Sequence, residues 1–137
     1  PGSSHLLASI IRKVSAAKDS GSKTIDVWGS GAARREFTYI QDLSDWLAST
    51  LNRLSELPSV LNVGAGIDHS VDEFYLRTMK AMGVEAKLVH DLGKPEGMRA
   101  KLLDSSLARR EHGWVTPTSL ETGIHNTLQW FRAQAGR

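Results

Sequence analysis

The sequence predicts an α/β fold, a small domain of helices mixed with short strands, and three observations carry that prediction. Apolar residues recur at helical spacing in several segments, and short β-prone runs lie between those segments. The chain has 137 residues, of which 40% are hydrophobic and 23% charged, as is typical of one globular domain. We therefore expect residues 1–137 to form a single domain with about four short strands, too few for a complete doubly wound sheet.

The first third of the chain predicts a helix, two strands and a second helix. Ser4 can cap the first helix, whose apolar face ends near residues 19–21. Residues 24–28 and 36–40 predict short strands, separated by a glycine-containing loop. The second helix is predicted over residues 42–54, because apolar residues recur there every three or four positions.

The remaining elements alternate in the same way. Residues 60–63 predict a strand that ends in a glycine turn, and a capping box at Ser70–Glu73 starts a helix that runs to about Gly83. Another short strand is predicted over residues 86–89, followed by a polar loop over residues 91–100.

Two helices close the predicted fold. Asp104 can cap a short helix that Gly113 ends, and a second capping box at Thr118–Glu121 starts the last helix. The residues predicted to face inward from the last helix are Leu120, Ile124, Leu128 and Phe131.

Composition excludes several classes of function. The net charge is only +2, so we expect neither a nucleic-acid nor a membrane partner, and any anion site must be local. The chain contains no cysteine, which excludes disulfides and thiolate chemistry within it. The five histidines show no metal-ligand spacing, and no apolar run is long enough to span a bilayer. We expect a cytoplasmic location.

The motifs of a redox enzyme are missing from the sequence. Gly64 and Gly66 match the first two glycines of the dinucleotide-binding motif, but His69 stands at the position of its third glycine. The Gly29–Gly31 turn fails in the same way, because Arg34 replaces the last glycine. Neither tyrosine is followed four residues later by lysine, so the pair that lowers a tyrosine pKa for proton transfer is absent. A plain turn is the favoured interpretation of both glycine segments.

Two basic loops are candidates for an anion site. Arg34 and Arg35 follow a glycine turn, where guanidinium groups can present paired donors to a phosphate. Lys94, Arg99 and Lys101 lie in or beside a second loop whose only acid after Asp91 is Glu96. Solvated surface arginines are the alternative, but two such loops on a nearly neutral domain suggest a diphosphate clamp.

Aromatic residues and one histidine leave further alternatives open. Trp28 ends a predicted strand beside glycines, so it could stack on a base or sugar, or else belong to the core. Packing is the favoured role for Trp46, Trp114 and Trp130 on their helical faces. His5, at the start of an apolar helix, is by itself more typical of a cap-region or interface residue than of a catalyst.

Several sequence blocks, taken in order, resemble a known family. They are Ser4-His5 with Ile11-Arg-Lys13, Trp28 to Phe37, Asn62 to Gly66, Lys94 to Gly97 with Lys101 to Asp104, Gly113-Trp114, and Ser119 to Gly123 through Trp130-Phe131. Together they are similar to the C-terminal portion of the GDP-L-fucose synthase family, which consists of extended short-chain dehydrogenase/reductase enzymes acting on nucleotide sugars. The resemblance covers essentially the whole chain.

The resemblance implies a substrate-binding part of a longer enzyme. The NADP-binding Rossmann domain would lie upstream of Pro1, so no cofactor is expected on residues 1–137 alone, which should be inactive. The complete enzyme would epimerise a GDP-4-keto-6-deoxyhexose and then reduce its ketone with NADPH, making an activated deoxysugar for surface polysaccharide.

The resemblance also implies roles for individual residues. His5 would be the catalytic acid of the epimerisation, and the substrate would contact the residues Leu6, Lys13, Trp28, Arg35 and Lys101. Lys13 stands where the family usually has arginine, and Tyr39 and Gln41 replace a histidine and an acid. These departures leave room for a related GDP-sugar or other NDP-sugar epimerase or reductase.

A stand-alone module that binds nucleotides or another phosphorylated ligand is the alternative function, and an RNA-binding role is a weaker one. The diphosphate clamp makes a structural prediction. Arg35 and Lys101 should lie on the same side of the molecule, and Trp28 should not be sealed in its interior.

Overall fold

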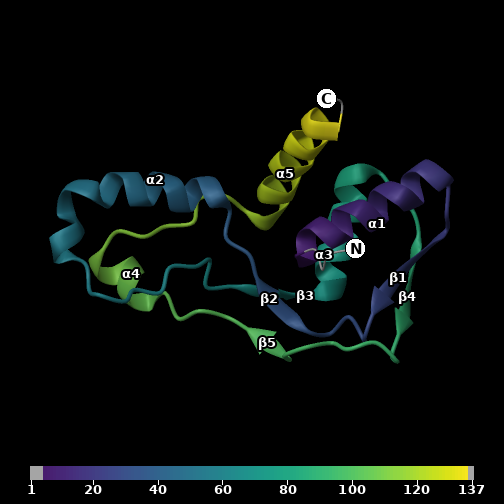
Figure 1. Cartoon of the computed structure of the whole chain (residues 1–137), viewed down its shortest axis with the longest axis horizontal. Helices are drawn as coiled ribbons and strands as arrows, with labels where there is room; N and C mark the ends of the chain where they lie inside the picture. The colour runs from purple at the N-terminus through teal and green to yellow at the C-terminus, as the bar shows by residue number, and fades with distance from the viewer. Residues whose placement is uncertain (1–4, 136–137) are drawn as a thin grey trace.

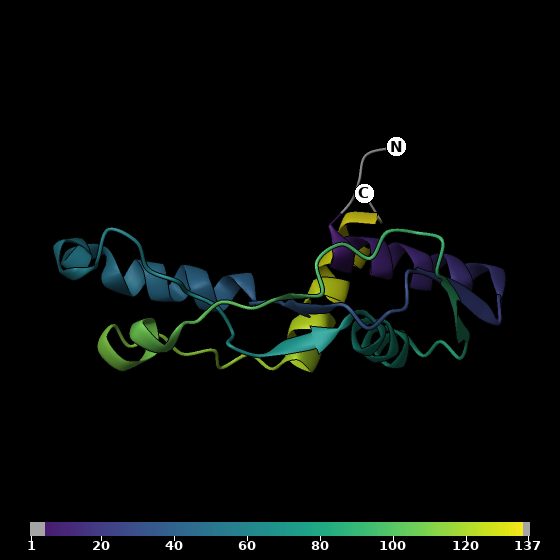
Figure 2. The ribbon, with the colours of Figure 1, turned by 90° about the horizontal axis from the view of Figure 1, so that it is seen from below.

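Residues 5–135 are described by the computed structural model, an elongated arrangement of short helices and strands (Figures 1 and 2). In chain order its elements are α1 (Leu6–Ser20), β1 (Thr24–Trp28), β2 (Arg34–Glu36), α2 (Ile40–Thr50), η1 (Leu51–Glu56), β3 (Asp68–Ser70), α3 (Val71–Met82), β4 (Lys87–Asp91), β5 (Ala100–Lys101), α4 (Ser106–Glu111) and α5 (Leu120–Ala135).

The strands form two small sheets. β1 and β4 pair in parallel, with Thr24 opposite Lys87. In the second sheet β2 lies between β3, to which it is antiparallel, and β5, to which it is parallel. Figure 1 shows the second sheet in the middle of the molecule, with α1, α3, β1 and β4 on one side and α2 and α4 on the other.

The apolar side chains form two clusters. The larger one joins α1, β1, α3 and α5, and includes Ile10, Val14, Val27, Phe74 and Ile124, each at most 1% exposed. The smaller cluster is built by Trp46 of α2, Ala108 of α4 and Trp114, and the two indole rings meet edge to face with centroids 5.7 Å apart. The central sheet therefore lies between two separately packed regions.

Most predicted helices are confirmed, with their local signals in place. Gly21 and Gly83 end α1 and α3 in the left-handed conformation, with φ of 67° and 65°. Ser70 and Glu73 form the predicted capping box of α3. Ser4 lies outside the described residues, and α1 starts at Leu6 with His5 as its N-cap residue.

Two strand predictions and one cap prediction are wrong. β2 covers residues 34–36 instead of 36–40, because Arg34 and Arg35 pair with both β3 and β5, whereas Ile40 already begins α2. Residues 60–63 form no strand, since no strand in the described chain lies beside them to receive their backbone hydrogen bonds. Helix α5 is capped by Ser119, whose hydroxyl accepts from Thr122 N at 3.1 Å, and not by Thr118.

Candidate functional site

Arg35 and Lys101 lie directly opposite each other on adjacent strands. They are register partners in the parallel pairing of β2 with β5. Register partners in a sheet project their side chains to the same face. The structure thus brings together one cation from each of the two basic loops, and Lys101 is exposed.

The Arg35 guanidinium also holds the second basic loop in place. Its Nη1 donates to the carbonyl oxygens of Arg34 at 2.6 Å and Met98 at 2.8 Å, and its Nη2 donates to that of Glu96 at 3.4 Å. These three bonds use three of its five N–H groups. Nε–H and one Nη2–H donate to none of these carbonyls. Arg35 can therefore hold the loop and also donate to a phosphate.

Arg34, the other member of the arginine pair, is already neutralised. Its Nε donates to Asp68 Oδ1 at 2.8 Å, and its Nη1 lies 3.8 Å from Glu73. The Glu73 carboxyl, which the Ser70 backbone N–H stabilises in its charged form, has its pKa lowered to about 2. Of the two adjacent arginines, Arg35 is therefore the candidate for binding a ligand.

Trp28 projects from the end of β1 into solvent, with 60% of its surface exposed. That exposure excludes a core role within the described residues. Lys13 Nζ lies 5.6 Å from the centroid of the indole ring, and Lys94 Nζ lies 5.7 Å from it. Lys13 Nζ also donates to the Asp26 carbonyl at 2.7 Å, which holds the ammonium group over the ring. The structure offers an exposed aromatic ring in a cationic setting, as a stacked anionic ligand requires.

Glu96 fastens the second basic loop to the turn after Trp28. Its Oε1 accepts a hydrogen bond from Ser30 N, and a Cβ at Gly29 would overlap its side chain. Hydrogen bonds from Ser30 hold the pKa of the Glu96 carboxyl below its usual range. Gly29, with φ of 74°, therefore gives both the left-handed turn and the room for this carboxylate.

Both glycine turns are packed against acidic side chains. At Gly64 the nearest atoms belong to Glu36, whose two carboxylate oxygens accept from Gly66 N at 2.5 Å and Leu103 N at 2.9 Å. At Gly31 the space is filled by the Asp72 carboxylate. An acidic side chain therefore lies beside the backbone of each of these two glycines.

His5 and Leu6 lie at the start of α1. The His5 side chain is exposed, and its carbonyl accepts from Ser9 N at 3.0 Å as the first bond of the helix. Lys13 follows eight residues later, about 12 Å further along the helix. Leu6 is partly buried against the larger apolar cluster. Arg35 is therefore paired with Lys101, and Lys13 contacts Trp28. No contact among the described residues connects His5 with either pair.

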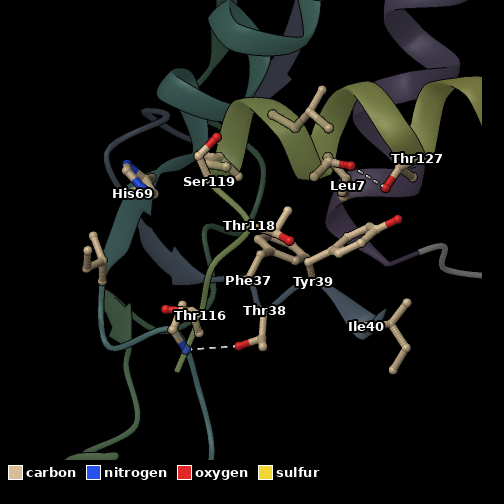
Figure 3. A pocket seen from close by; sticks show the side chains of 15 residues that line it. Leu7, Phe37, Thr38, Tyr39, Ile40, His69, Thr116, Thr118, Ser119 and Thr127 are labelled. Atoms are coloured by element: carbon tan, nitrogen blue, oxygen red, sulfur yellow. Dashed lines mark hydrogen bonds between the residues drawn. The ribbon is translucent and has the colours of Figure 1, made fainter. Parts of the chain in front are cut away.

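A largely apolar cavity of about 330 Å³ links the start of α1 to the end of β2 (Figure 3). Leu7, Phe37 and Tyr39 line it together with residues of α5. Thr38 Oγ1, which accepts from Ala65 N at 3.0 Å, fixes the chain after β2 along one wall. His5 and Arg35 each lie two residues along the chain from a residue that lines it, Leu7 and Phe37 respectively.

The remaining tryptophans divide between core and surface. Trp46 and Trp114 are 8% and 1% exposed, as predicted, and each indole N–H donates to a backbone carbonyl. Trp130 is 64% exposed, so the packing role predicted for it is wrong within this chain. It lies two residues after the buried Leu128, which turns it about 200° away from the apolar face of α5.

Two acids that organise the site carried little signal in the sequence. Glu96 was noticeable only as the acid in a basic loop, and Glu36 follows the arginine pair without any motif. Their partners are backbone N–H groups 30 to 67 residues away in the chain, which no local pattern reveals. Among residues 5–135 no group of three or more acidic or histidine side chains could hold a metal ion, and no helix is both long and apolar enough to cross a membrane.

Comparison with solved structures identifies the class of fold. A GDP-L-fucose synthetase from Naegleria fowleri superimposes with a TM-score of 0.82 at 26% identity, over 98% of this chain and 41% of its own. A GDP-mannoheptose C4 reductase from Campylobacter jejuni, solved with NADP bound, gives a TM-score of 0.81 at 27% identity, over 95% of this chain and 45% of its own. The predicted α/β fold class is confirmed, and it is that of part of an extended short-chain dehydrogenase/reductase.

Sequence comparison specifies the relatives within that class. The model of the NAD dependent epimerase/dehydratase family matches residues 1–64. The chain is 40% identical to the GDP-L-colitose synthase of Yersinia pseudotuberculosis over 128 residues, and 40% identical to the GDP-L-fucose synthase of Azorhizobium caulinodans over 131 residues. It spans 41% and 42% of the length of those two relatives. The predicted resemblance to the GDP-L-fucose synthase family is therefore confirmed.

Proposed function

We propose that this chain forms the nucleotide-sugar-binding part of an NADP-dependent epimerase/reductase. The substrate would be a GDP-4-keto-6-deoxyhexose, epimerised beside the carbonyl and then reduced at the ketone. The single observation that best supports the proposal is the pairing of Arg35 with Lys101 across β2 and β5, which places two cations on one face of the sheet. A diphosphate carries charge and acceptor oxygens to match both groups.

Different residues of the chain would bind different parts of an extended ligand. Arg35 and Lys101 would hold the diphosphate, and the exposed ring of Trp28 would stack on the base, with Lys13 beside it. Binding energy gained on these remote groups orients the sugar ring at the reacting end. His5 would transfer the proton there, while Leu6 contacts the substrate at the start of the same helix.

The hydride chemistry requires a second part of the enzyme, the Rossmann domain of the family, to bind NADP. A surface suited to covering by such a part runs along α2 and η1, where apolar residues recur on one side. These residues, 46% to 67% exposed, are Ile40, Leu47, Leu51 and Leu54. Burying them would stabilise the assembly of the two parts. We place this reaction in the cytoplasm, and residues 1–137 alone would be inactive.

Calorimetric titration with GDP tests the anion site. The experiment uses the full-length protein, meaning the longest natural polypeptide that contains this chain. Arg35→Ala and Lys101→Ala should each weaken binding by about tenfold, the effect of one hydrogen-bonded ion pair. Lys80→Ala, which removes a cation from the last turn of α3, is the matched control and should leave the affinity unchanged. Wild-type affinity in both site variants would refute the proposal.

Solvent-isotope exchange tests the role of His5. In the full-length protein His5→Gln should abolish deuterium incorporation beside the keto group of the substrate, because glutamine cannot transfer that proton. Binding of NADPH should be unaffected, which shows that the variant is folded. Retained exchange would count against His5 as the proton donor.

A further inference from the structure

The Glu36 carboxylate joins two segments that are far apart in the sequence. Its Oε2 accepts from Leu103 N at 2.9 Å, and its Oε1 accepts from Gly66 N at 2.5 Å. Leu103 follows two residues after Lys101, the last residue of β5. Glu36 therefore ties the chain that leaves β5 to the glycine turn before β3.

Strand β5 depends on contacts outside its own ladder, because it is only two residues long. Its pairing with β2 sets Lys101 opposite Arg35. Before Lys101, the loop is held by the Arg35 guanidinium, which donates to Met98 O at 2.8 Å. After Lys101, the chain is held by the bond from Leu103 N to Glu36. Lys101 thus lies between two contacts that fix its backbone, one on each side along the chain.

The Glu36 side chain itself faces away from the anion site. Successive residues of a strand project to opposite faces of a sheet, so Glu36 lies on the face opposite Arg35 and Lys101. Its register partner on β3 is Asp68, another acid, so attraction to that strand does not favour a carboxylate here. Both oxygens accept from backbone N–H groups instead. The acid is therefore placed to act on the position of the chain and not on a ligand.

We propose that Glu36 is a positioning residue of the anion site, which sets Lys101 beside Arg35 by holding Leu103. This inference rests on the proposed function and adds to it a residue that does not touch the substrate. A flexible lysine side chain contributes to binding only as far as its backbone is fixed near the ligand. Without the bond to Glu36, the short strand would be held on one side only, and Lys101 would spend less time opposite Arg35.

Electrostatics alone predicts the opposite effect of removing this acid. Glu36 carries a negative charge next to Arg35 in the chain, and a negative charge weakens the attraction of the site for a diphosphate. Loss of the charge by itself would strengthen the binding of GDP, whereas loss of the positioning contact weakens it. The sign of the change in affinity therefore separates the two effects.

Three variants of the full-length protein test the proposal. Glu36→Gln removes the charge and one of the two acceptor oxygens. Gly64→Ala keeps the charge but displaces the carboxylate, because a Cβ there would lie 2.5 Å from Glu36 Oε1. Asp42→Asn is the matched control. This buried acid also accepts from a distant backbone N–H, that of Thr118 at 3.2 Å, but it ties α2 to the segment before α5.

Calorimetry with GDP and with guanosine measures the effect in proteins with and without Lys101. Glu36→Gln and Gly64→Ala should each weaken the binding of GDP by about three- to tenfold, because the most that Glu36 can remove is the contact of Lys101 itself. The affinity for guanosine, which has no phosphate, should stay at the wild-type value. In the Lys101→Ala background neither change should weaken GDP binding further. Asp42→Asn should leave GDP binding unchanged in both backgrounds, and melting curves check that each variant is folded.

The outcomes distinguish this inference from the function on which it rests. If Lys101→Ala weakens GDP binding but Gly64→Ala does not, or if Glu36→Gln strengthens it, the inference is overturned and the proposed function stands. The inference is also overturned if both changes weaken GDP binding equally with and without Lys101, or weaken guanosine binding as well, because Glu36 would then support the fold as a whole. If wild-type protein binds no GDP, the proposed function fails and this inference fails with it.

Discussion

Gly64 and Glu36 should be energetically coupled, because the space that glycine leaves is occupied by that one carboxylate. A Cβ at Gly64 would lie 2.5 Å from Glu36 Oε1, and its three nearest neighbours all belong to Glu36. The backbone of Gly64 is outside the positive-φ region, so alanine there meets a steric obstacle and no conformational one. Removing the Glu36 side chain should therefore remove the penalty of the alanine.

The magnitudes follow from the contacts. Glu36→Ala removes two hydrogen bonds from backbone N–H groups to a charged acceptor, at 2.5 and 2.9 Å. At about 1.5 kcal/mol for each bond, this variant should lose about 3 kcal/mol of unfolding free energy. Gly64→Ala in the wild-type protein should cost about 1–3 kcal/mol through overpacking. In the Glu36→Ala background the same change should cost less than about 0.5 kcal/mol.

Urea denaturation of the four proteins in this cycle gives the coupling free energy. Gly66→Ala supplies the control, because Gly66 has φ of 73° and a Cβ there would meet the Arg109 guanidinium at 2.8 Å. Its penalty should persist when Glu36 is removed. Additive costs for Gly64→Ala and Glu36→Ala would show that the carboxylate does not occupy this space, and would refute the reasoning.

Two further predictions concern the stability of the helices and of the smaller cluster. Glu73→Gln should lower the unfolding free energy at neutral pH by about 1 kcal/mol, a value kept low because the side chain is 38% exposed. The pKa of Glu73 is about 2 in the folded protein and 4.5 in the unfolded chain, so the stability that the charged carboxylate contributes is complete above pH 4.5 and is lost as the pH falls toward 2. The melting temperatures of wild type and variant should therefore converge between pH 4.5 and pH 2. A constant difference between them would contradict the role of Glu73 in the capping box. Trp114→Phe should cost about 2 kcal/mol in urea denaturation, because it removes the indole N–H bond to Gly64 O at 2.7 Å and leaves a cavity. Trp130→Phe, on the exposed side of α5, is its control, and equal costs would contradict the burial described for Trp114.

The sequence predicted those elements that depend on local chemistry. Helices α1 and α3 end where glycine adopts the left-handed conformation, and the box of Ser70 and Glu73 is a contact between neighbours in the chain. The strand over residues 60–63 was wrong because a β-prone run needs a partner, and pairing is decided by distant segments. For the same reason β2 is shifted toward Arg34, which pairs with Ser70 and Ala100.

The candidate site was predictable only in part. The clustering of cations in two loops was visible in the sequence, but their meeting depends on the register that sets Arg35 opposite Lys101. The ion pair of Arg34 with Asp68 could not be foreseen, because 34 residues separate the two partners. The roles of His5 and Leu6 rest on family resemblance, since no spacing or contact in the described chain distinguishes them.

A comparison of GDP with guanosine tests most directly whether Arg35 and Lys101 bind the diphosphate. The assay titrates both ligands into wild-type full-length protein and into the double variant Arg35→Ala/Lys101→Ala, following the fluorescence of Trp28 against a Trp28→Phe reference. The double variant should bind GDP no better than guanosine, while its affinity for guanosine should equal that of the wild type. A double variant that still prefers GDP over guanosine by the wild-type factor would contradict it.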